Sequence, residues 1–296
     1  MAEIVAVNGE IFRILEEAKI SVFDRGFLFG DGVYEVVRSY GRVLFAIEDH
    51  IDRMIQSAAR IDLDLGATKQ QLIDELYRVY KQADQDDMYV RIVVTRGTGQ
   101  RINIDPNQPL TSNTVIYVKA IEKWDPKQHE EGVDIITSSI FRNPKKSLDP
   151  NIKSGNYLNN IMAIAEAKKK KVYDAVMTSS EGYITEGPTW NVFIVKDKKF
   201  ISPPDDSDIL HGITRKIIRG LCRDNNLEMV ERNFKVDEFK KADEAFSSGS
   251  VKEVLPIRSI DGVKIGTGKP GPMTKKLAQL YKDYVKNYCG RYRRNA

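Results

Sequence analysis

The chain has 296 residues, 41% hydrophobic and 30% charged, a composition typical of a globular protein with room for two domains. Its 46 Lys and Arg against 42 Asp and Glu leave a net charge of +4, too small an excess to indicate nucleic-acid binding. It contains no membrane-length apolar stretch, no signal-peptide pattern and no CxxC motif around Cys222 or Cys289, so we predict a cytoplasmic protein without a membrane partner, disulfide framework or metal site.

The first half of the chain predicts strands, then helices, then strands. An Asn-Gly pair between apolar runs predicts a hairpin over Ile4–Ile14, and a second hairpin over Gly32–Ala46 should turn at Tyr40 and Gly41. Apolar residues at helical spacing predict the two helices, and apolar runs predict the two buried strands that follow. The expected ranges are 48–62 and 68–83 for the helices and 88–95 and 114–120 for the strands.

Between residues 121 and 131 the apolar pattern lapses into charged and polar residues around Pro126. Such a stretch is typical of a connection between domains. We therefore predict an N-terminal domain of residues 1–121, a linker of residues 122–131 and a larger C-terminal domain of residues 132–296.

The second half again mixes strands and helices, without an internal repeat. Strands are predicted over 133–138 and 175–178, hairpin turns at 197–198 and 261–262, and helices after Lys153, over 214–225 and over 272–288. The fold class predicted from these elements is α+β, in two domains.

Lys153 lies at a predicted junction between a loop and a helix. Pro150 excludes a helix before it, Asn156 is a candidate cap after it, and Leu158, Ile161 and Met162 recur at helical spacing. An amine among small and apolar residues can be partly desolvated, which lowers its pKa as a Schiff-base lysine requires. Most lysines are solvated surface groups, so the residues alone leave that alternative open.

Two segments are candidates for binding an anion. Residues 211–214 lead into a helix, whose free amides and Thr214 hydroxyl could hold a phosphate, although simple capping by Thr214 is the alternative. Ser247–Ser250 is predicted as a small-residue turn whose amides could bind an anion or could only connect two strands. Glu186 stands between apolar strand segments, where a buried carboxylate requires a cationic partner.

The order and spacing of several motifs resemble one family over nearly the whole chain. The motifs are Val22–Glu35, Glu48–Met54, Asn151–Asn160, Thr185–Gly187, Asn191–Phe193 and Gly212–Arg215. They resemble the class IV, fold-type IV pyridoxal-phosphate (PLP) aminotransferases, a family that includes branched-chain and D-amino-acid aminotransferases and aminodeoxychorismate lyase. The resemblance implies a smaller N-terminal α/β domain and a larger C-terminal domain with a β-barrel-like sheet.

The resemblance also assigns the catalytic pair. It implies that Lys153 forms the Schiff base with PLP and moves the proton between the substrate Cα and the coenzyme. Glu186 would meet the pyridine nitrogen and keep it protonated, so that the ring withdraws electrons.

The remaining coenzyme contacts follow from the same resemblance. Arg53 would hold the phosphate, together with Ile213, Thr214 and Ser250, the last standing where the family usually has Thr. Tyr157 would approach the phenolic oxygen of the coenzyme.

Substrate residues are less closely matched. Tyr34 and Arg38 share one face of a predicted strand, so Arg38 either contacts a substrate carboxylate or faces solvent. Arg101 resembles an arginine with which D-amino-acid enzymes grip the substrate carboxylate, but Asn103 replaces the histidine that accompanies it. Val251 stands where branched-chain enzymes have a small residue, so we expect it at a differently shaped substrate pocket.

We therefore predict ping-pong transamination between an amino acid, preferably an L-branched-chain one, and a 2-oxo acid such as 2-oxoglutarate. A D-amino-acid aminotransferase is the second reading, and a lyase resembling aminodeoxychorismate lyase is the third. A binding protein without chemistry is disfavoured because Lys153 and Glu186 are both present. The resemblance further implies a homodimer, and the residues indicate no nucleic-acid partner.

Overall fold

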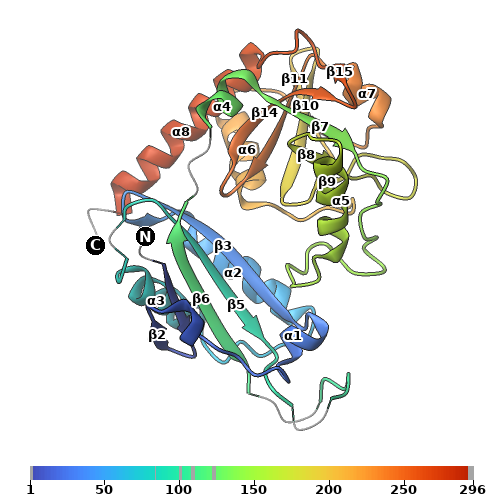
Figure 1. Cartoon of the computed structure of the whole chain (residues 1–296). Helices are drawn as coiled ribbons and strands as arrows, with labels where there is room; N and C mark the ends of the chain where they lie inside the picture. Colours follow the sequence, from blue (N-terminus) through green and yellow to red (C-terminus); the bar gives the residue numbers. More distant parts are fainter. Residues whose placement is uncertain (1–2, 84, 100–101, 108–110, 122–124, 293–296) are drawn as a thin grey trace. The chain divides into compact units, whose positions relative to one another are not determined.

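The structure, a computed structural model, describes residues 3–83, 85–99, 102–107, 111–121 and 125–292, which form two compact units (Figure 1). The first unit comprises Met1–Glu122, Ile152–Asn156 and Asn287–Ala296, and the second comprises Lys123–Asn151 and Tyr157–Lys286. The first unit therefore includes a short segment that contains Lys153. The predicted domain limits stay a prediction, and residues 122–124 of the predicted linker lie outside the described residues.

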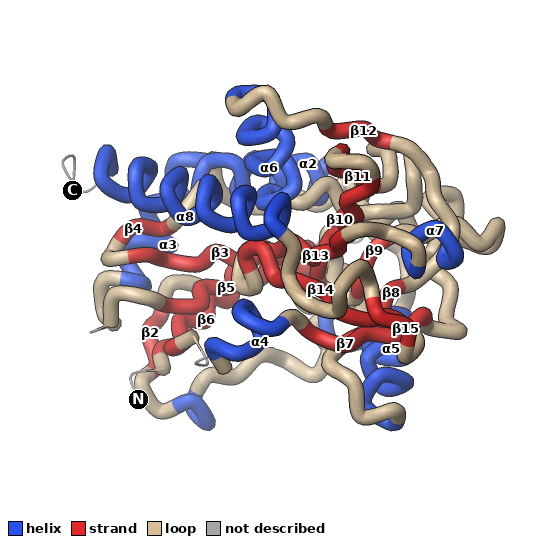
Figure 2. Tube along the Cα trace, turned by 90° about the horizontal axis from the view of Figure 1, so that it is seen from above, coloured by secondary structure: helices blue, strands red, loops and turns tan. Residues whose placement is uncertain are grey.

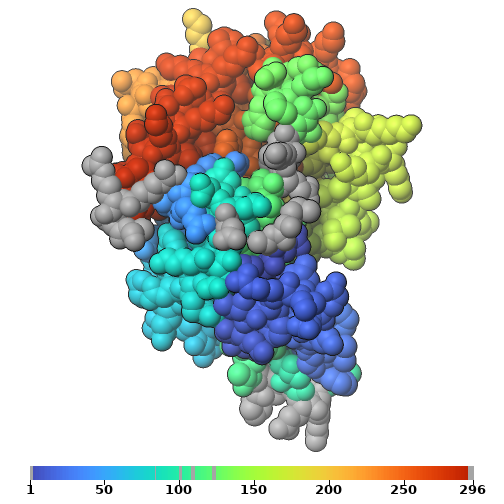
Figure 3. All heavy atoms as spheres, turned by 60° about the vertical axis from the view of Figure 1, so that its left-hand side comes forward, coloured from blue at the N-terminus to red at the C-terminus, as the bar shows by residue number. Residues whose placement is uncertain are grey.

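Within the described residues, the first unit contains a six-stranded antiparallel sheet in the order β2-β1-β6-β5-β3-β4. Its strands are β1 (Ile4–Val7), β2 (Glu10–Phe12), β3 (Gly32–Tyr40), β4 (Val43–Leu44), β5 (Met88–Thr95) and β6 (Asn113–Ala120). The N-terminal segment, dark blue in Figure 3, forms part of the surface of this unit.

Both predicted hairpins of the first unit are confirmed. Asn8 and Gly9 have φ angles of 50° and 87°, the positive values that a tight turn between twisted strands requires. The second turn lies one residue later than predicted, because Tyr40 still pairs with β4 and the residues with positive φ are Gly41 and Arg42.

Helices α2 (Ile47–Ala59) and α3 (Lys69–Tyr80) cover one face of this sheet (Figures 1 and 2). They confirm the two predicted helices, although each ends about a turn early. Thr68 and Gln71 cap α3 reciprocally, each side chain accepting from the main-chain N–H of the other. Every second residue of β3, β5 and β6 packs under the helices, which leaves the alternate residues for the opposite face.

Short helices α1 (Arg25–Phe29) and η1 (Leu15–Glu17) were not predicted. Asp24 caps α1 by accepting from the N–H groups of Gly26 and Phe27, and a left-handed Gly30 ends it. A helix this short lacks the repeated apolar spacing by which longer helices are recognised.

The second unit contains a nine-stranded mixed sheet within the described residues. The main path is β12-β11-β10-β13-β14-β7-β8, with β9 beside β10 and β15 beside β14, and the pairs β7–β8, β7–β14 and β11–β12 are parallel. The strands are β7 (Val133–Thr137), β8 (Asp174–Val176), β9 (Glu186–Gly187), β10 (Trp190–Lys196), β11 (Lys199–Ser202), β12 (Met229–Glu231), β13 (Glu244–Gly249), β14 (Glu253–Ile260) and β15 (Val263–Lys264). The predicted strands of this half are confirmed, with β7 and β8 ending one and two residues early, and so are the hairpin turns at 197–198 and 261–262.

One predicted turn is wrong. Ser247, Ser248 and Gly249 are strand residues at the end of β13, and the turn comprises only Ser250 and the two residues after it. Ser247 and Ser248 pair with Leu255 and Val254 of β14, so the small side chains continue the ladder where a loop was expected.

Helices α5 (Leu158–Lys169), α6 (Ile213–Asp224), α7 (Val236–Lys240) and α8 (Pro272–Tyr292) follow in chain order. The three long ones confirm predicted helices. Part of the predicted linker is also helical, since α4 occupies Pro126–Glu131. Asp125 caps α4 and Pro126 takes its first turn, where the missing N–H costs nothing. Among the described helices none is both long and apolar enough to cross a bilayer.

Helix α5 differs from its prediction in two ways. Its N-cap is Tyr157, without a side-chain cap, whereas the Asn156 amide donates to the carbonyl of Gly30 in the first unit. Its predicted apolar side is exposed. Leu158, Ile161 and Met162 are 70%, 56% and 46% exposed, while the buried positions of α5 are Asn160, Ala163 and Ala167.

Candidate active site

The main chain of Lys153 is hydrogen-bonded on both sides within the first unit. Its N–H donates to Ser57 Oγ of α2 at 3.2 Å, and its carbonyl accepts from the N–H of Tyr34 in β3 at 2.9 Å. The next residue, Ser154, forms a single antiparallel bridge with Val33. The lysine is therefore attached to a helix and to a strand edge, which limits where its side chain can go.

The ammonium of Lys153 lies against Tyr34. Lys153 Nζ donates to Tyr34 Oη at 3.2 Å and lies 4.4 Å from the centre of the ring. The guanidinium carbon of Arg91 lies 4.1 Å from the same ring centre. A buried phenol ring thus contacts two cations, each attracted to its electron-rich face.

Arg53 is buried in α2 and paired with a carboxylate. Its Nε and Nη2 donate to the two oxygens of Glu35 at 2.6 and 2.8 Å, and His50 Nδ1 lies 2.7 Å from Glu35. Glu35 is fully buried on the helix side of β3. The sequence identified Arg53 but missed Glu35 as its partner, although a carboxylate in an apolar strand was itself the signal that singled out Glu186.

The charges of this cluster set its protonation. Burial raises the pKa of the Glu35 carboxyl, but the charge of Arg53 and the hydrogen bonds from Arg53 and His50 outweigh burial and hold the pKa far below its usual value. Burial lowers the pKa of His50, and the cations Arg53 and Lys153 lower it further against the attraction of Glu35. The cluster therefore carries an ionised carboxylate, an arginine and a neutral imidazole near neutral pH.

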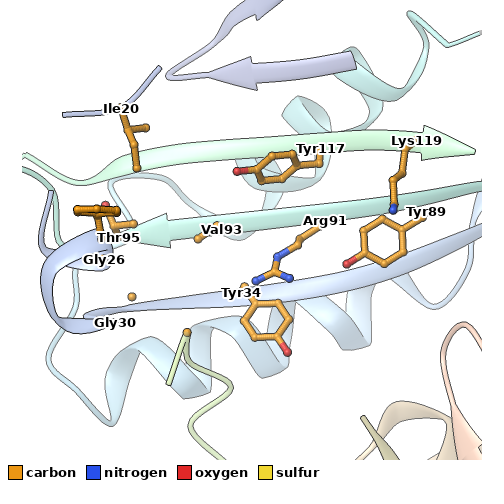
Figure 4. A pocket seen from close by; sticks show the side chains of 13 residues that line it. Ile20, Gly26, Gly30, Tyr34, Tyr89, Arg91, Val93, Thr95, Tyr117 and Lys119 are labelled. Atoms are coloured by element: carbon orange, nitrogen blue, oxygen red, sulfur yellow. The ribbon is translucent and has the colours of Figure 1, made fainter. Parts of the chain in front are cut away.

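The face of the first sheet opposite α2 and α3 carries a pocket of about 510 Å³ (Figure 4). It is lined by Ile20, Gly26, Phe27, Gly30, Gly32, Tyr34, Tyr89, Arg91, Val93, Thr95, Tyr117, Lys119 and Gly155. Arg91 reaches this face because it pairs with Val36 of β3, two positions along the strand from Tyr34. The sequence missed Arg91, since only the strand register places it beside Tyr34.

The other predicted substrate residues of the first unit fare differently. Arg38 lies on β3 with its guanidinium carbon 4.4 Å from the ring centre of Tyr40, and it does not line the pocket. Arg101 lies outside the described residues. Their roles stay predictions.

In the second unit, Glu186 is buried on β9 among three donors. Its oxygens accept from Arg142 Nε at 2.9 Å, from Asn191 Nδ2 at 3.1 Å and from the N–H of Leu210 at 3.0 Å. Arg142 supplies the cation that the sequence argument required. The sequence did not identify Arg142, because it follows the irregular end of β7 and belongs to no recognisable pattern.

Helix α6 begins without a side-chain cap, so simple capping by Thr214 is wrong. Its N-cap is Gly212, where a Cβ would lie 2.1 Å from Asn191 Oδ1. Ile213 and Thr214 are buried in the first turn, and the buried Arg215 ties that turn to Asp205 and other acceptors. The free amides of a fixed, uncapped helix start suit an anion.

The turn after β13 adds polar groups to the second unit. Ser250 and Val251 are partly buried there, and Ser248 Oγ is buried without a hydrogen-bond partner among the described residues. The ammonium of Lys252 pairs with Asp174 at 2.6 Å, so its charge is already compensated.

The predicted site residues fall into two sets. Tyr34, Arg38, Arg53 and Lys153 belong to the first unit, and Tyr157, Glu186, Ile213, Thr214, Ser250 and Val251 belong to the second. The groups present suit PLP: a lysine amine for its aldehyde, an uncapped helix start and a buried unpartnered hydroxyl for its phosphate, and a buried carboxylate for its ring nitrogen. Over the described part of the chain, His, Cys, Asp and Glu form no cluster of three or more that could hold a metal ion.

The sequence model of the amino-transferase class IV family matches residues 32–260. The chain belongs to this family. This aminotransferase is 37% identical, over 94% of its length and 95% of the relative, to a putative branched-chain-amino-acid aminotransferase of Methanocaldococcus jannaschii. It is 35% identical, over 96% of its length and 98% of the relative, to D-alanine aminotransferase of Staphylococcus haemolyticus.

Among solved structures, the branched-chain amino acid aminotransferase from Thermobaculum terrenum, crystallised in its PLP-bound holo form, superposes with a TM-score of 0.86 at 28% identity. The superposition covers 98% of this chain and 96% of that one. The predicted family, the fold class and PLP-dependent transamination are confirmed.

Proposed function

We propose that this aminotransferase moves amino groups between an L-branched-chain amino acid and an acidic 2-oxo acid such as 2-oxoglutarate. The name of the Methanocaldococcus jannaschii relative supports the amino donor. The observation that supports an acidic acceptor is the position of Arg91. Its guanidinium and the Lys153 ammonium both contact the Tyr34 ring.

The surroundings of Arg91 support this reading. Among the described residues no Asp or Glu forms an ion pair with Arg91, and a guanidinium in a pocket is suited to a bidentate carboxylate contact. Ile20, Phe27 and Val93 line the same pocket and give it an apolar part. A pocket of this kind accommodates an aliphatic side chain and an acidic one in alternate half-reactions.

Two side chains carry the proposed chemistry. PLP supplies an aldehyde that condenses with amines and a ring that withdraws electrons from the substrate Cα. Lys153 would hold the coenzyme through its aldehyde and would move a proton at the substrate Cα. Glu186, held by Arg142 and two amide donors, keeps a proton on the ring nitrogen.

The remaining residues bind the coenzyme in this proposal. The phosphate is held by Arg53, by Ile213 and Thr214 at the start of α6, and by Ser250. The uncapped start of α6 supports this assignment. Tyr157 meets the phenolic oxygen, and Val251 borders the substrate.

D-amino-acid transamination is the second candidate. It is favoured by relatives of 35% and 36% identity that are named D-alanine aminotransferase, from Staphylococcus haemolyticus and Bacillus licheniformis. Arg101 would then grip the substrate carboxylate, and Arg101→Ala would impair D-substrates far more than L-substrates.

Initial rates with L-leucine and D-alanine as donors and 2-oxoglutarate as acceptor test the substrate class. We expect faster turnover of L-leucine, and faster turnover of D-alanine would replace the first candidate by the second. Lys153→Ala should abolish turnover and the visible absorbance of the lysine-bound coenzyme. Lys146→Ala, an exposed lysine seven residues earlier, is the matched control and should retain both.

We also propose a homodimer, as the family resemblance implies. In the first unit Val22 and Phe27 are 65% and 68% exposed, and in the second unit Leu158 and Ile161 of α5 are exposed apolar residues. Contiguous exposed apolar patches mark surfaces that a partner covers, and we propose that these side chains belong to such a patch in each unit. Light scattering should give the mass of two chains, and Phe27→Glu should shift it toward one, whereas Val263→Glu, a control on β15, should not.

A cytoplasmic location remains part of the proposal. Cys222 is buried and forms no disulfide among the described residues, which is the usual state of a thiol in a reducing compartment.

A further inference from the structure

Ser57 connects helix α2 to the peptide of Lys153. Its side chain is fully buried, and its hydroxyl donates to the carbonyl of Arg53, one turn earlier, at 2.9 Å. The same oxygen accepts the N–H of Lys153 at 3.2 Å. One hydroxyl therefore satisfies a helix carbonyl and a main-chain N–H from a segment almost a hundred residues away.

Further contacts of the segment Ile152–Asn156 come from groups that follow the Lys153 N–H along the chain. The carbonyl of Lys153 accepts from Tyr34, Ser154 pairs with Val33, and the Asn156 amide donates to Gly30. Those contacts hold the segment to β3 and to the end of α1. Ser57 holds the N–H side of Lys153, whereas β3 holds its carbonyl side.

Arg53 and Ser57 occupy the same face of α2, since they are four residues apart. The Glu35 carboxylate fixes the guanidinium of Arg53, and Ser57 fixes the peptide of Lys153. A single buried helical turn thus determines the positions of a proposed phosphate ligand and of the proposed coenzyme lysine. Errors of about 1 Å in such positions reduce rates by as much as ~100-fold.

We infer that Ser57 is a positioning residue for Lys153. The Ser57 hydroxyl orients the peptide group of Lys153 so that the side-chain amine stays against Tyr34. The inference rests on the proposed role of Lys153 as the coenzyme lysine. It assigns no chemical step to Ser57, whose hydroxyl contacts main-chain groups.

The chain contains a matched control in Ser39. Ser39 is also fully buried in the first unit, and its hydroxyl also bridges two main-chain groups, donating to the carbonyl of Asp86 and accepting the N–H of Met88. These groups lie at the far end of β3 from Tyr34. Ser39→Ala therefore measures the general effect of deleting a buried bridging hydroxyl.

The first experiment measures hydrogen exchange by mass spectrometry on the holoenzymes of wild type, Ser57→Ala and Ser39→Ala. Ser57→Ala should speed exchange of a peptide containing Ile152–Asn156 by about tenfold, because the Lys153 N–H loses its acceptor. Ser39→Ala should leave the exchange rate of this peptide unchanged and should speed exchange at the start of β5. Equal exchange of Ile152–Asn156 in both variants would overturn the inference.

The second experiment measures kcat, KM and the visible circular dichroism of the bound coenzyme, which reports its orientation. We expect Ser57→Ala to lower kcat by about tenfold with KM nearly unchanged, and to weaken the dichroic band, while Ser39→Ala changes neither. Ser57→Cys retains a weak acceptor of similar size and should fall between alanine and wild type. An unaltered band and kcat in Ser57→Ala would contradict a positioning role.

Failure of the proposed function is separable from failure of this inference. Borohydride reduction of the wild-type holoenzyme, followed by peptide mapping, identifies the lysine that carries the coenzyme. A pyridoxyl group on any residue other than Lys153 would overturn the proposed function and, with it, the positioning role. A pyridoxyl group on Lys153 with a Ser57→Ala variant that behaves like Ser39→Ala would overturn the inference alone.

Discussion

Each unit buries one carboxylate beside proposed coenzyme residues, and the two carboxylates have different partners. Glu35 in the first unit faces Arg53 and His50, both from α2, and its side chain is fully buried. Glu186 in the second unit accepts, among the described residues, from the cation Arg142 and from the neutral amides of Asn191 and Leu210, and retains slight exposure. One arginine binds both oxygens of Glu35, whereas two of the three described donors to Glu186 are neutral.

Burial alone therefore does not identify a functional carboxylate. A carboxylate bound in both oxygens by an arginine is an anchor, because its hydrogen-bonding capacity serves the fold. A carboxylate oriented mainly by neutral donors keeps its charge available for a cationic group such as a protonated ring nitrogen. Glu35 and Glu186 should therefore respond differently to the same substitution.

The largest effect is expected for catalysis in Glu186→Gln. The amide cannot hold a proton on the ring nitrogen, so kcat/KM should fall by about 10²- to 10³-fold. Steady-state kinetics with saturating PLP measure this loss. The melting temperature should fall less than in Glu35→Gln. Unchanged kcat/KM would mean that Glu186 serves only the fold.

Glu35→Gln should act mainly on stability. It leaves the Arg53 charge buried without a counter-charge, which typically costs about 3–5 kcal/mol of unfolding free energy. Urea denaturation of the coenzyme-free enzyme, in which no phosphate faces Arg53, measures it. The surface pair of Arg78 and Glu75 provides the control, since Glu75→Gln should cost less than about 1 kcal/mol. Similar losses in the two variants would show that the cluster is not an anchor.

Arg91→Met removes a pocket cation that has no carboxylate partner among the described residues. Loss of a charged hydrogen bond of about 1.5–3 kcal/mol predicts a tenfold to hundredfold rise in KM for 2-oxoglutarate. The KM for L-leucine should change little. Lys119→Met, farther along the pocket, is the control, and equal rises for both substrates would contradict selective binding of the acidic one.

The smallest effect is expected from pH, through His50. Because the folded pKa of His50 lies below its unfolded value of 6.5, the unfolded chain binds a proton there that the folded chain does not. Stability is therefore retained above pH 6.5 and lost as pH falls toward the folded pKa, by at most about 1.4 kcal/mol at about pH 5.5. Unfolding of wild type and His50→Gln at about pH 7.5 and about pH 5.5 should show a smaller loss in the variant. Identical losses would refute the buried neutral imidazole.

Local sequence determined the secondary structure where short-range physics is strong. The Asn8-Gly9 turn requires positive φ angles that this pair adopts readily, and apolar spacing predicted α2, α3 and α6. Local sequence did not predict which side chains are buried where burial depends on contacts with other segments. The spacing of Leu158 and Ile161 predicted that α5 is a helix but not which side of it is buried: both are exposed, and small residues on another side of α5 are buried instead.

The sequence by itself determined the family and the coenzyme, because Lys153 and Glu186 occur in ordered motifs that are readable without coordinates. Tertiary structure alone decided the partners of these residues. Ser57, Arg91 and Arg142 carry no local signal, since their roles arise from strand register and from contacts between distant segments. Spacing along the chain governs turns and helix faces, whereas hydrogen bonds between remote residues form only when the fold brings them within about 3 Å.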